Sequence, residues 1–393
     1  MKNEIYFDYI SAYPLDPRVR QTMADYLELS WPNPSSQHKL GDLASEAMQK
    51  ARGYVAGLIQ AKPEEIVFTS GGTESINQAI KGVAWALQEK GNHIVTSNIE
   101  HNAVLRSLRM LKMMDYKVTS VDVDEFGLVD PADVKKAITD KTILVSIMHA
   151  NNEIGTIEPI AEIAKIAKDR GVLFHTDAVA SGGVVLIDVQ GIGVDLLSLA
   201  ANQIYGPSGV GALYIRQGSP LWPLLDGGVQ EGNRRAGTEN VLGIVGMGEA
   251  AKIGREEMGV RAGHTLKLKR LLHTKIENTI EDVYFNGHPT RSLPNLLSVC
   301  FEYVEGESTM IMLGDADICV STRSACAAGA LQASHVLLAI GRDFVIAQGA
   351  IVFSFGIFNT EEEIEKIIEE LKSTVNMLRN ISALSKKRKQ ATG

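Results

Sequence analysis

The sequence has few cysteines and no long apolar run, and both absences narrow its class. Its three cysteines (Cys300, Cys319 and Cys326) are too few for a disulfide framework, and their spacing is not that of a paired metal site. No apolar stretch is long enough to span a membrane, and no apolar signal segment follows Met1. We therefore expect a cytoplasmic protein in a reducing compartment, with no membrane contact.

The sequence also has no excess of basic residues over acidic ones. The formal net charge is −8, which argues against nucleic acid as the main partner. The one strongly basic run, residues 386–389, falls in a predicted flexible tail at 383–393.

Between about residues 60 and 215, short β-rich runs alternate with helical stretches. This alternation predicts βαβ units, and so an α/β fold with a mostly parallel sheet whose ligand site lies at the carboxyl ends of the strands. The expected strands are Ile66–Thr69, His93–Ser97, Ile143–Met148, Val172–His175, Leu196–Leu199 and Gly211–Ile215, and the clearest helices are Ser75–Gln88, Ala132–Thr139 and Ile160–Asp169.

After about residue 255 the pattern changes to a charged helix at Leu266–Asn278, a strand near Asn295–Phe301 and a final helix that begins with a capping box, Thr360 to Glu363. We predict a large domain at 15–255 and a smaller α+β domain made of 1–14 and 256–382. The Gly-rich stretch 227–238 is interpreted as a functional loop.

Residues 70–77 (Ser-Gly-Gly-Thr-Glu-Ser-Ile-Asn) directly follow a predicted strand and open a helix. Small residues let backbone N–H groups approach an anion there, and the helix dipole favours a phosphate. An ordinary strand–helix joint explains the stretch equally well, so by itself it leaves both interpretations open.

Eight motifs spread over the chain carry a more specific signal. They are Gly-Gly-Thr-Glu-Ser-Ile-Asn at 71–77, Glu-His at 100–101, His-Ala-Asn-Asn-Glu-Ile-Gly-Thr at 149–156, His-Thr-Asp-Ala at 175–178, Tyr-Gly-Pro-Ser-Gly-Val-Gly-Ala-Leu-Tyr at 205–214, Gln-Glu-Gly-Asn-Arg-Arg-Ala-Gly-Thr at 230–238, Ser-Ala-Cys at 324–326 and Ser-His-Val-Leu at 334–337. In this order the chain resembles the cysteine desulfurases, which are pyridoxal-phosphate enzymes. The resemblance implies an aspartate-aminotransferase-like large domain with a seven-stranded sheet, and a smaller α+β C-terminal domain.

The resemblance also implies a set of cofactor contacts. Gly72 and Thr73 would bind the phosphate, and His101, expected to be catalytic, would stack on the pyridine ring. Asn152 would bind the ring hydroxyl, and Asp177 would pair with the ring nitrogen. Thr238 would reach the phosphate site of a neighbouring subunit, which implies a homodimer.

Six positions depart from the family pattern. The lysine to which the cofactor is covalently attached is replaced by Gln203, whose amide has no basic lone pair. No lysine occurs between Lys168 and Lys252. The others are Ala200 and Asn202 for polar cofactor contacts, Ala180 for a glutamine, Val352 for the arginine that binds the substrate carboxylate, and Gly232 for a loop arginine. We predict a pseudoenzyme that binds pyridoxal phosphate non-covalently at most and has little or no ordinary desulfurase turnover.

Cys326 remains at the position of the family's catalytic cysteine, on a loop of small residues in which Arg323 replaces a glycine. The resemblance implies that its thiolate carries a persulfide or helps to ligate a transient iron–sulfur cluster. An inert cysteine is the alternative. Cys300 and Cys319 are interpreted as core residues.

Three hypotheses follow. The chain is a sulfur-transfer component of iron–sulfur cluster assembly, working through Cys326 with a scaffold protein or another sulfur acceptor. Alternatively, it is a desulfurase that acts on free cysteine with non-covalently bound cofactor, or a non-catalytic dimer partner of an active paralogue.

Overall fold

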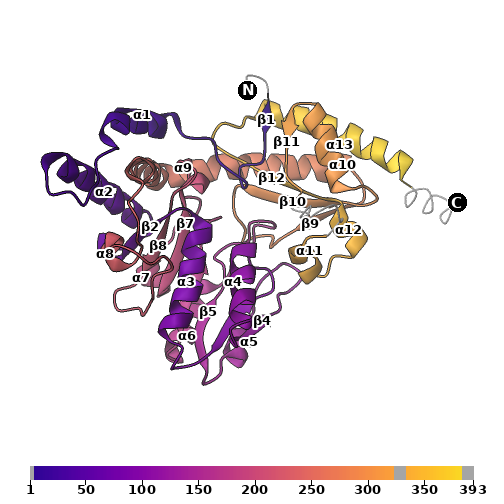
Figure 1. Ribbon diagram of the computed structural model, residues 1–393. Coiled ribbons are helices and arrows are strands. Elements are labelled where there is room, and N and C mark those ends of the chain that lie inside the picture. Colours follow the sequence, from indigo (N-terminus) through magenta and orange to yellow (C-terminus); the bar gives the residue numbers. More distant parts are fainter. Residues whose placement is uncertain (1–3, 323–332, 383–393) are drawn as a thin grey trace.

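The computed structural model describes residues 4–322 and 333–382, and its centre is a seven-stranded sheet (Figure 1). The strand order is β2-β8-β7-β6-β5-β3-β4, and only β8 runs antiparallel to its neighbours. The predicted α/β class with a mostly parallel sheet is confirmed. The strands are β2 (Ile66–Thr69), β3 (His93–Ser97), β4 (Lys117–Val121), β5 (Thr142–Ser146), β6 (Leu173–Asp177), β7 (Leu196–Ala200) and β8 (Gly211–Ile215).

Both faces of this sheet are covered by helices because successive strand residues point to opposite faces. Val67 packs in one apolar cluster with residues of α3 and α4, whereas Phe68, the next residue, packs in another with residues of α2, α6 and α9. The helices of this part are α1 (Pro17–Tyr26), α2 (Lys39–Leu58), α3 (Gly72–Ala86), α4 (Asn102–Lys112), α5 (Pro131–Ala137), α6 (Ile160–Asp169), α7 (Val189–Ile192) and α8 (Gln230–Asn233), with short 3-10 turns η1 (Leu27–Leu29), η2 (Pro63–Glu65) and η3 (Ala201–Gln203).

A smaller set of strands forms a second centre. Strand β10 (Leu296–Phe301) lies between β9 (Val283–Asn286) and β12 (Ala350–Ser354), antiparallel to both, and β1 (Ile5–Tyr6) pairs with β11 (Ile318–Cys319). The helices here are α10 (Gly306–Asp315), α11 (His335–Ala339), α12 (Phe344–Gln348) and α13 (Glu361–Ile381). The predicted capping box at Thr360 and Glu363 is present at the start of α13.

Helix α9 (Val241–Thr279) is much longer than the predicted helix at 266–278 and continues without a break through the expected boundary near 255. Its first half was missed because it is rich in glycine, which disfavours helix. Close packing explains Gly248, because a Cβ there would lie 2.6 Å from the Cα of Ala51 on α2. The placement of the two domains stays a prediction.

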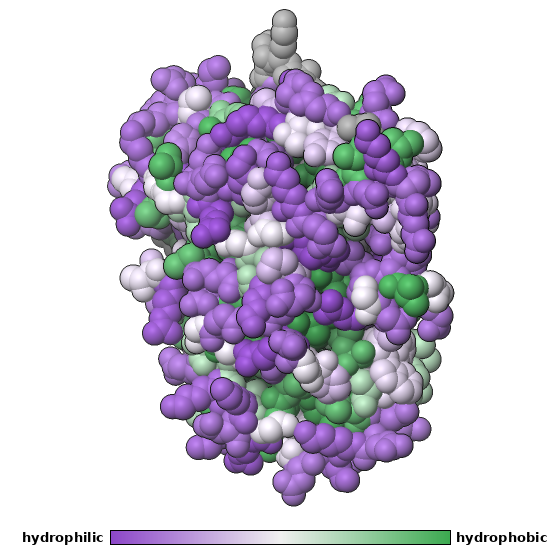
Figure 2. All heavy atoms as spheres, turned by 90° about the vertical axis from the view of Figure 1, so that its left-hand side faces the viewer, coloured by the Kyte–Doolittle hydropathy of each residue, from purple (hydrophilic) through white to green (hydrophobic). Residues whose placement is uncertain are grey.

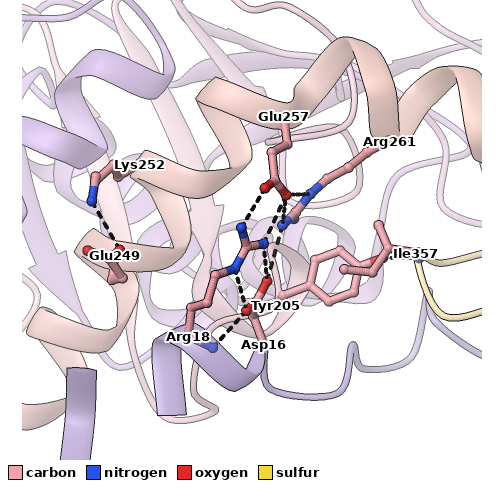
Figure 3. Close-up of polar contacts among 8 residues, drawn as sticks. All are labelled: Asp16, Arg18, Tyr205, Glu249, Lys252, Glu257, Arg261 and Ile357. Atoms are coloured by element: carbon pink, nitrogen blue, oxygen red, sulfur yellow. Dashed lines mark hydrogen bonds and ion pairs between the residues drawn. The ribbon is translucent and has the colours of Figure 1, made fainter. Parts of the chain in front are cut away.

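The N-terminal segment is tied to α9 and to the turn after β7 by an ionic network (Figure 3). Asp16 accepts hydrogen bonds from Arg18, at 2.8 Å, and from Arg261 of α9, at 3.2 Å. The Arg261 guanidinium lies 4.8 Å from the ring centroid of Tyr205, whose hydroxyl accepts a hydrogen bond from the backbone N–H of Ile357. The segment around residue 16 therefore fixes the backbone next to the end of η3.

Within residues 4–322 and 333–382, none of the helices has the length and apolar character needed to cross a membrane. The same residues contain no cluster of three or more His, Cys, Asp or Glu side chains suited to a metal ion.

Candidate functional site

A cavity of about 320 Å³ lies where the carboxyl ends of β6 and β7 meet the first turns of α3 and α4. The structure brings together nine of the residues singled out from the sequence: Gly72, Thr73, His101, Asn152, Asp177, Ala180, Ala200, Asn202 and Gln203. Ile10, Ser11, Ile76, Met148, Ala150 and Val179 complete the lining. None of these described lining residues is a lysine or arginine.

The first turn of α3 forms one wall. Its N-cap is Gly71, which has no side chain to accept the first N–H groups, so these groups remain available to an anion. The backbone at Gly72 lies close to the segment that follows β6, because a Cβ on Gly72 would lie 2.6 Å from the side chain of Val179. Glu74, the acidic residue of this turn, forms an ion pair with Arg235 at 2.9 Å. The backbone N–H groups of this wall can therefore bind a phosphate, although the described lining has no lysine or arginine.

Asp177, the last residue of β6, is the only carboxylate of the described lining. It is buried, and its Oδ1 accepts a hydrogen bond from the Val179 N–H at 2.9 Å. Burial raises the pKa of Asp177, and nearby His101 opposes that shift. A buried carboxylate without a lysine or arginine in the described lining favours a ligand that brings a positive charge, such as a protonated ring nitrogen.

His101 is the N-cap of α4. Its Nδ1 accepts a hydrogen bond from the backbone N–H of Ala103 at 3.1 Å, which places any proton of the neutral ring on Nε2. The side chain is exposed, so a face of the imidazole is available for stacking on a planar ligand.

Glu100, immediately before His101, is fully buried and was not singled out from the sequence as a site residue. Its Oε1 accepts hydrogen bonds from Ser97 Oγ at 2.7 Å and from the N–H of Met148 at 3.0 Å, while Oε2 has no partner among the described residues. Burial raises the pKa of Glu100 to about 8, with Asp177 adding to the shift. This shift favours the neutral form of Glu100, whose Oε1 holds the backbone of Met148 at the cavity.

Asn152 lies within a tightly bonded turn. The neighbouring Asn151 is fully buried; its Oδ1 accepts from the N–H groups of Glu153 and Ile154, and its Nδ2 donates to the carbonyl of Ile99. These bonds fix the backbone that presents Asn152 to the cavity.

Gln203 ends the η3 turn after β7 and is 8% exposed. Its Nε2 donates to the carbonyl oxygens of Ile10, at 3.1 Å, and Ser11, at 3.4 Å. Its Oε1 accepts no hydrogen bond from the described residues. The contribution of Ile10 and Ser11 could not be found from local sequence signals, because they lie nearly 200 positions away in the chain.

An apolar cluster lies beside the cavity. Val352, on β12, is 1% exposed and packs with Ile10, Ala150 and Ala180, all three of which line the cavity. The side where the resemblance implies binding of a substrate carboxylate is thus apolar.

Among the described residues, Thr238 and Gly232 were also singled out from the sequence but do not line the cavity. Thr238 and Gly232 are exposed and belong to the loop around α8, where Gly232 has a φ of +64°. Cys326 and Arg323 lie outside the described residues. Of the other cysteines, Cys300 is fully buried, with a pKa raised to about 11 by burial, and Cys319 is only partly buried.

Comparison with known proteins decides the family. The aminotransferase class-V model matches residues 5–367. The chain belongs to this family. Within it the chain is 48% identical over 382 residues to the cysteine desulfurase IscS of Dictyoglomus turgidum, with 97% of each chain covered. It is 46% identical to the IscS of Methanosarcina thermophila, covering 98% of this chain and 95% of that one.

The chain also has the fold of a solved NifS-like protein, with a TM-score of 0.90. The two proteins are 38% identical, and the match covers 95% of this chain and all of the other. The prediction of the cysteine desulfurase family is confirmed. The chemistry of the cavity is compatible with the ring and phosphate of the family's cofactor: a buried carboxylate (Asp177) suits a protonated ring nitrogen, an exposed imidazole (His101) suits stacking, and the glycine-capped start of α3 suits a phosphate. The described lining has no amine to which that cofactor could be covalently attached.

Proposed function

We propose that this chain works in sulfur transfer for iron–sulfur cluster assembly and does not release sulfur from cysteine by the family's usual lysine-dependent route. The observation that carries the proposal is Gln203, which lines the cavity at the family's lysine position while no lysine appears in the described lining. An amide at this position neither attaches the cofactor nor accepts and returns the substrate proton.

The other residues of the cavity support binding of pyridoxal phosphate without covalent attachment. The cofactor, when bound, supplies an electron sink next to the substrate carbon. Asp177 would hold the ring nitrogen protonated, His101 would stack on the ring, Asn152 would bind the ring hydroxyl, and Thr73 with the backbone N–H of Gly72 would bind the phosphate. The apolar cluster around Val352 leaves a substrate carboxylate without a cationic partner, which weakens binding of cysteine.

Cys326 is the residue we propose to carry the transferred sulfur, as a persulfide or as a ligand of a transient cluster. The support for this role is its sequence position alone. A scaffold protein or another sulfur acceptor would be the partner, and a cytoplasmic location stays a prediction.

The decisive experiment compares the natural chain with Gln203→Lys and Cys326→Ala. We expect negligible sulfide release from free cysteine by the natural chain. Gln203→Lys should hold pyridoxal phosphate through denaturation after borohydride reduction. Robust turnover by the natural chain would refute the impairment. In a reconstituted assembly reaction supplied with a persulfide donor, Cys326→Ala should reduce cluster formation, and an unchanged yield would refute the role of Cys326.

A second candidate is a desulfurase that uses non-covalently bound cofactor with free cysteine. The raised pKa and burial of Asp177 favour it, because that carboxylate gains a partner when a protonated ring binds. Slow sulfide release that requires added cofactor and disappears in Asp177→Asn would support this candidate over the first.

We also propose a dimer, as the resemblance implies for Thr238. Figure 2 looks onto the side that carries α1, α2 and α8 and shows hydrophobic residues exposed among polar ones. Trp31 and Val229 are 73% and 79% exposed. Sedimentation should give a dimer that Val229→Glu weakens; co-purification of a second class-V chain from the native cell would instead favour a non-catalytic partner of an active paralogue.

A further inference from the structure

Most of the cavity lining is left over once the ring and phosphate are accounted for. Of its fifteen described residues, five are the proposed contacts of the cofactor: Gly72, Thr73, His101, Asn152 and Asp177. The other ten carry no charged side chain. Seven of them are apolar (Ile10, Ile76, Met148, Ala150, Val179, Ala180 and Ala200), and three are polar but uncharged (Ser11, Asn202 and Gln203). A group attached to the cofactor therefore meets no lysine or arginine of the described lining, whichever way it points.

The hydrogen-bond donors of two of these polar residues are already engaged. Gln203 Nε2 donates to the carbonyl oxygens of Ile10, at 3.1 Å, and Ser11, at 3.4 Å. Ser11 Oγ donates to Oδ1 of Asp8 at 2.7 Å, so this exposed edge of the cavity also lies next to a second carboxylate. Asn202 is the third polar residue, and its neutral amide binds a carboxylate more weakly than a guanidinium does.

The apolar part of the lining is backed by further apolar side chains. Ile10, Ala150 and Ala180 pack in one cluster with Val352, which is 1% exposed. A carboxylate pressed against this wall would lose its water without gaining a charged partner, and that loss is costly. Asp177, the one carboxylate of the described lining, is buried at the same cavity and adds repulsion between like charges.

We propose that this cavity selects, as the partner of the cofactor, a primary amine without a carboxylate group over an amino acid. An aminothiol is the member of that class that also carries transferable sulfur. This inference rests on the proposed function, since it assumes that the ring and phosphate bind here. Ring and phosphate are the same for every amine, so the selection arises from the ten lining residues that do not hold them.

Three stable probes separate charge from size. Borohydride reduction of pyridoxal phosphate with ethylamine, L-alanine or L-alaninamide gives secondary amines that share the ring and phosphate and differ only in a hydrogen, a carboxylate or a neutral carboxamide. Isothermal titration of the purified full-length chain with each probe measures the three affinities. The lack of a charged partner predicts that the alanine probe binds about tenfold more weakly than the ethylamine probe, or weaker still. The alaninamide probe should lie much closer to the ethylamine probe.

Val352→Arg is the complementary test, because the resemblance implies the family's carboxylate-binding arginine at this position. It should raise the affinity for the alanine probe relative to the ethylamine probe, whereas Val352→Leu should keep the natural preference. Circular dichroism and the affinity for the ethylamine probe show whether each variant keeps its cavity. A folded Val352→Arg that still discriminates fully against the alanine probe would contradict the explanation by charge.

The outcomes separate this inference from the proposed function. If the alanine probe binds as tightly as the ethylamine probe, or if alaninamide is rejected as strongly as alanine, the selection is wrong and the cofactor site stands. If none of the three probes binds, the cofactor site and the selection are both wrong. Should Val352→Arg fail to fold, the three probes on the natural chain still decide.

Discussion

Replacing Glu100 with glutamine should stabilise the protein, and by more as the pH rises. Glu100 is fully buried, and its pKa of about 8 means that it is protonated in the folded protein at pH 7. In the unfolded chain the same carboxyl has a pKa near the ordinary value of 4.5 and is ionised. Folding at pH 7 therefore requires the uptake of a proton.

The size of this effect follows from linkage. Because the folded-state pKa is raised, the stability that the neutral acid contributes is fully present below pH 4.5. It is lost progressively as the pH rises to about 8. The loss is about 1.4 kcal/mol per pH unit in this window, or about 3 kcal/mol between pH 5 and 7. Glutamine at position 100 does not titrate. Its Oε1 can still accept from Ser97 and Met148, and its amino group replaces an oxygen that has no partner in the described structure.

Urea unfolding of the natural chain and Glu100→Gln at pH 5, 6 and 7 measures the difference. We expect the gap between the two midpoints to widen with pH in favour of the variant. Glu28→Gln, at an exposed position, is the control and should show no such trend. A gap that stays constant across this range would show that Glu100 does not change its charge on folding, and would refute the reasoning.

Three further predictions concern other parts of the fold. Glu231→Ala should lower the free energy of unfolding by about 3–5 kcal/mol, measured with urea. The reason is that the buried guanidinium of Arg52, which pairs with Glu231 at 2.6 Å, would lose its carboxylate partner. A decrease below about 1 kcal/mol would contradict this. Val352→Arg should lower the melting temperature by burying an unpaired charge, and free cysteine should restore part of the loss in this variant but not in the natural chain. Thr360→Ala should cost about 1 kcal/mol by removing the cap of α13, whereas Thr360→Ser should be nearly neutral.

The regular parts of the fold were predictable because they depend on local pattern. Apolar runs bounded by polar turns predicted β2, β3 and β8 with their observed bounds, and the apolar periodicity predicted α6. The first half of α9 was not predictable, since its glycines oppose helix formation locally and the close contacts of Gly246 with Met23 and of Gly248 with Ala51 involve segments far away in the sequence.

The candidate site divides in the same way. Asp177 ends a strand and Thr73 begins a helix. Both could be expected near one site, because ligands of α/β proteins bind at the carboxyl ends of the parallel strands. The roles of Ile10 and Ser11 could not, because their backbone carbonyls carry no side-chain signature and reach Gln203 from the other end of the chain. Nor does the pattern around Glu100 reveal that its carboxyl is buried and neutral.

The course of the first sixteen residues has a mechanical consequence. Strand β1 pairs with β11, and Cys326 follows β11 by a few residues in the sequence. On the other side of β1, the backbone N–H of Tyr13 donates a hydrogen bond to the carbonyl of Asn202, which lines the cavity. Residues 5–13 therefore link β11 to the cavity wall through backbone hydrogen bonds at both ends. Removing residues 5–13 would break this link, and it would also remove Ile10 and Ser11 from the cavity lining.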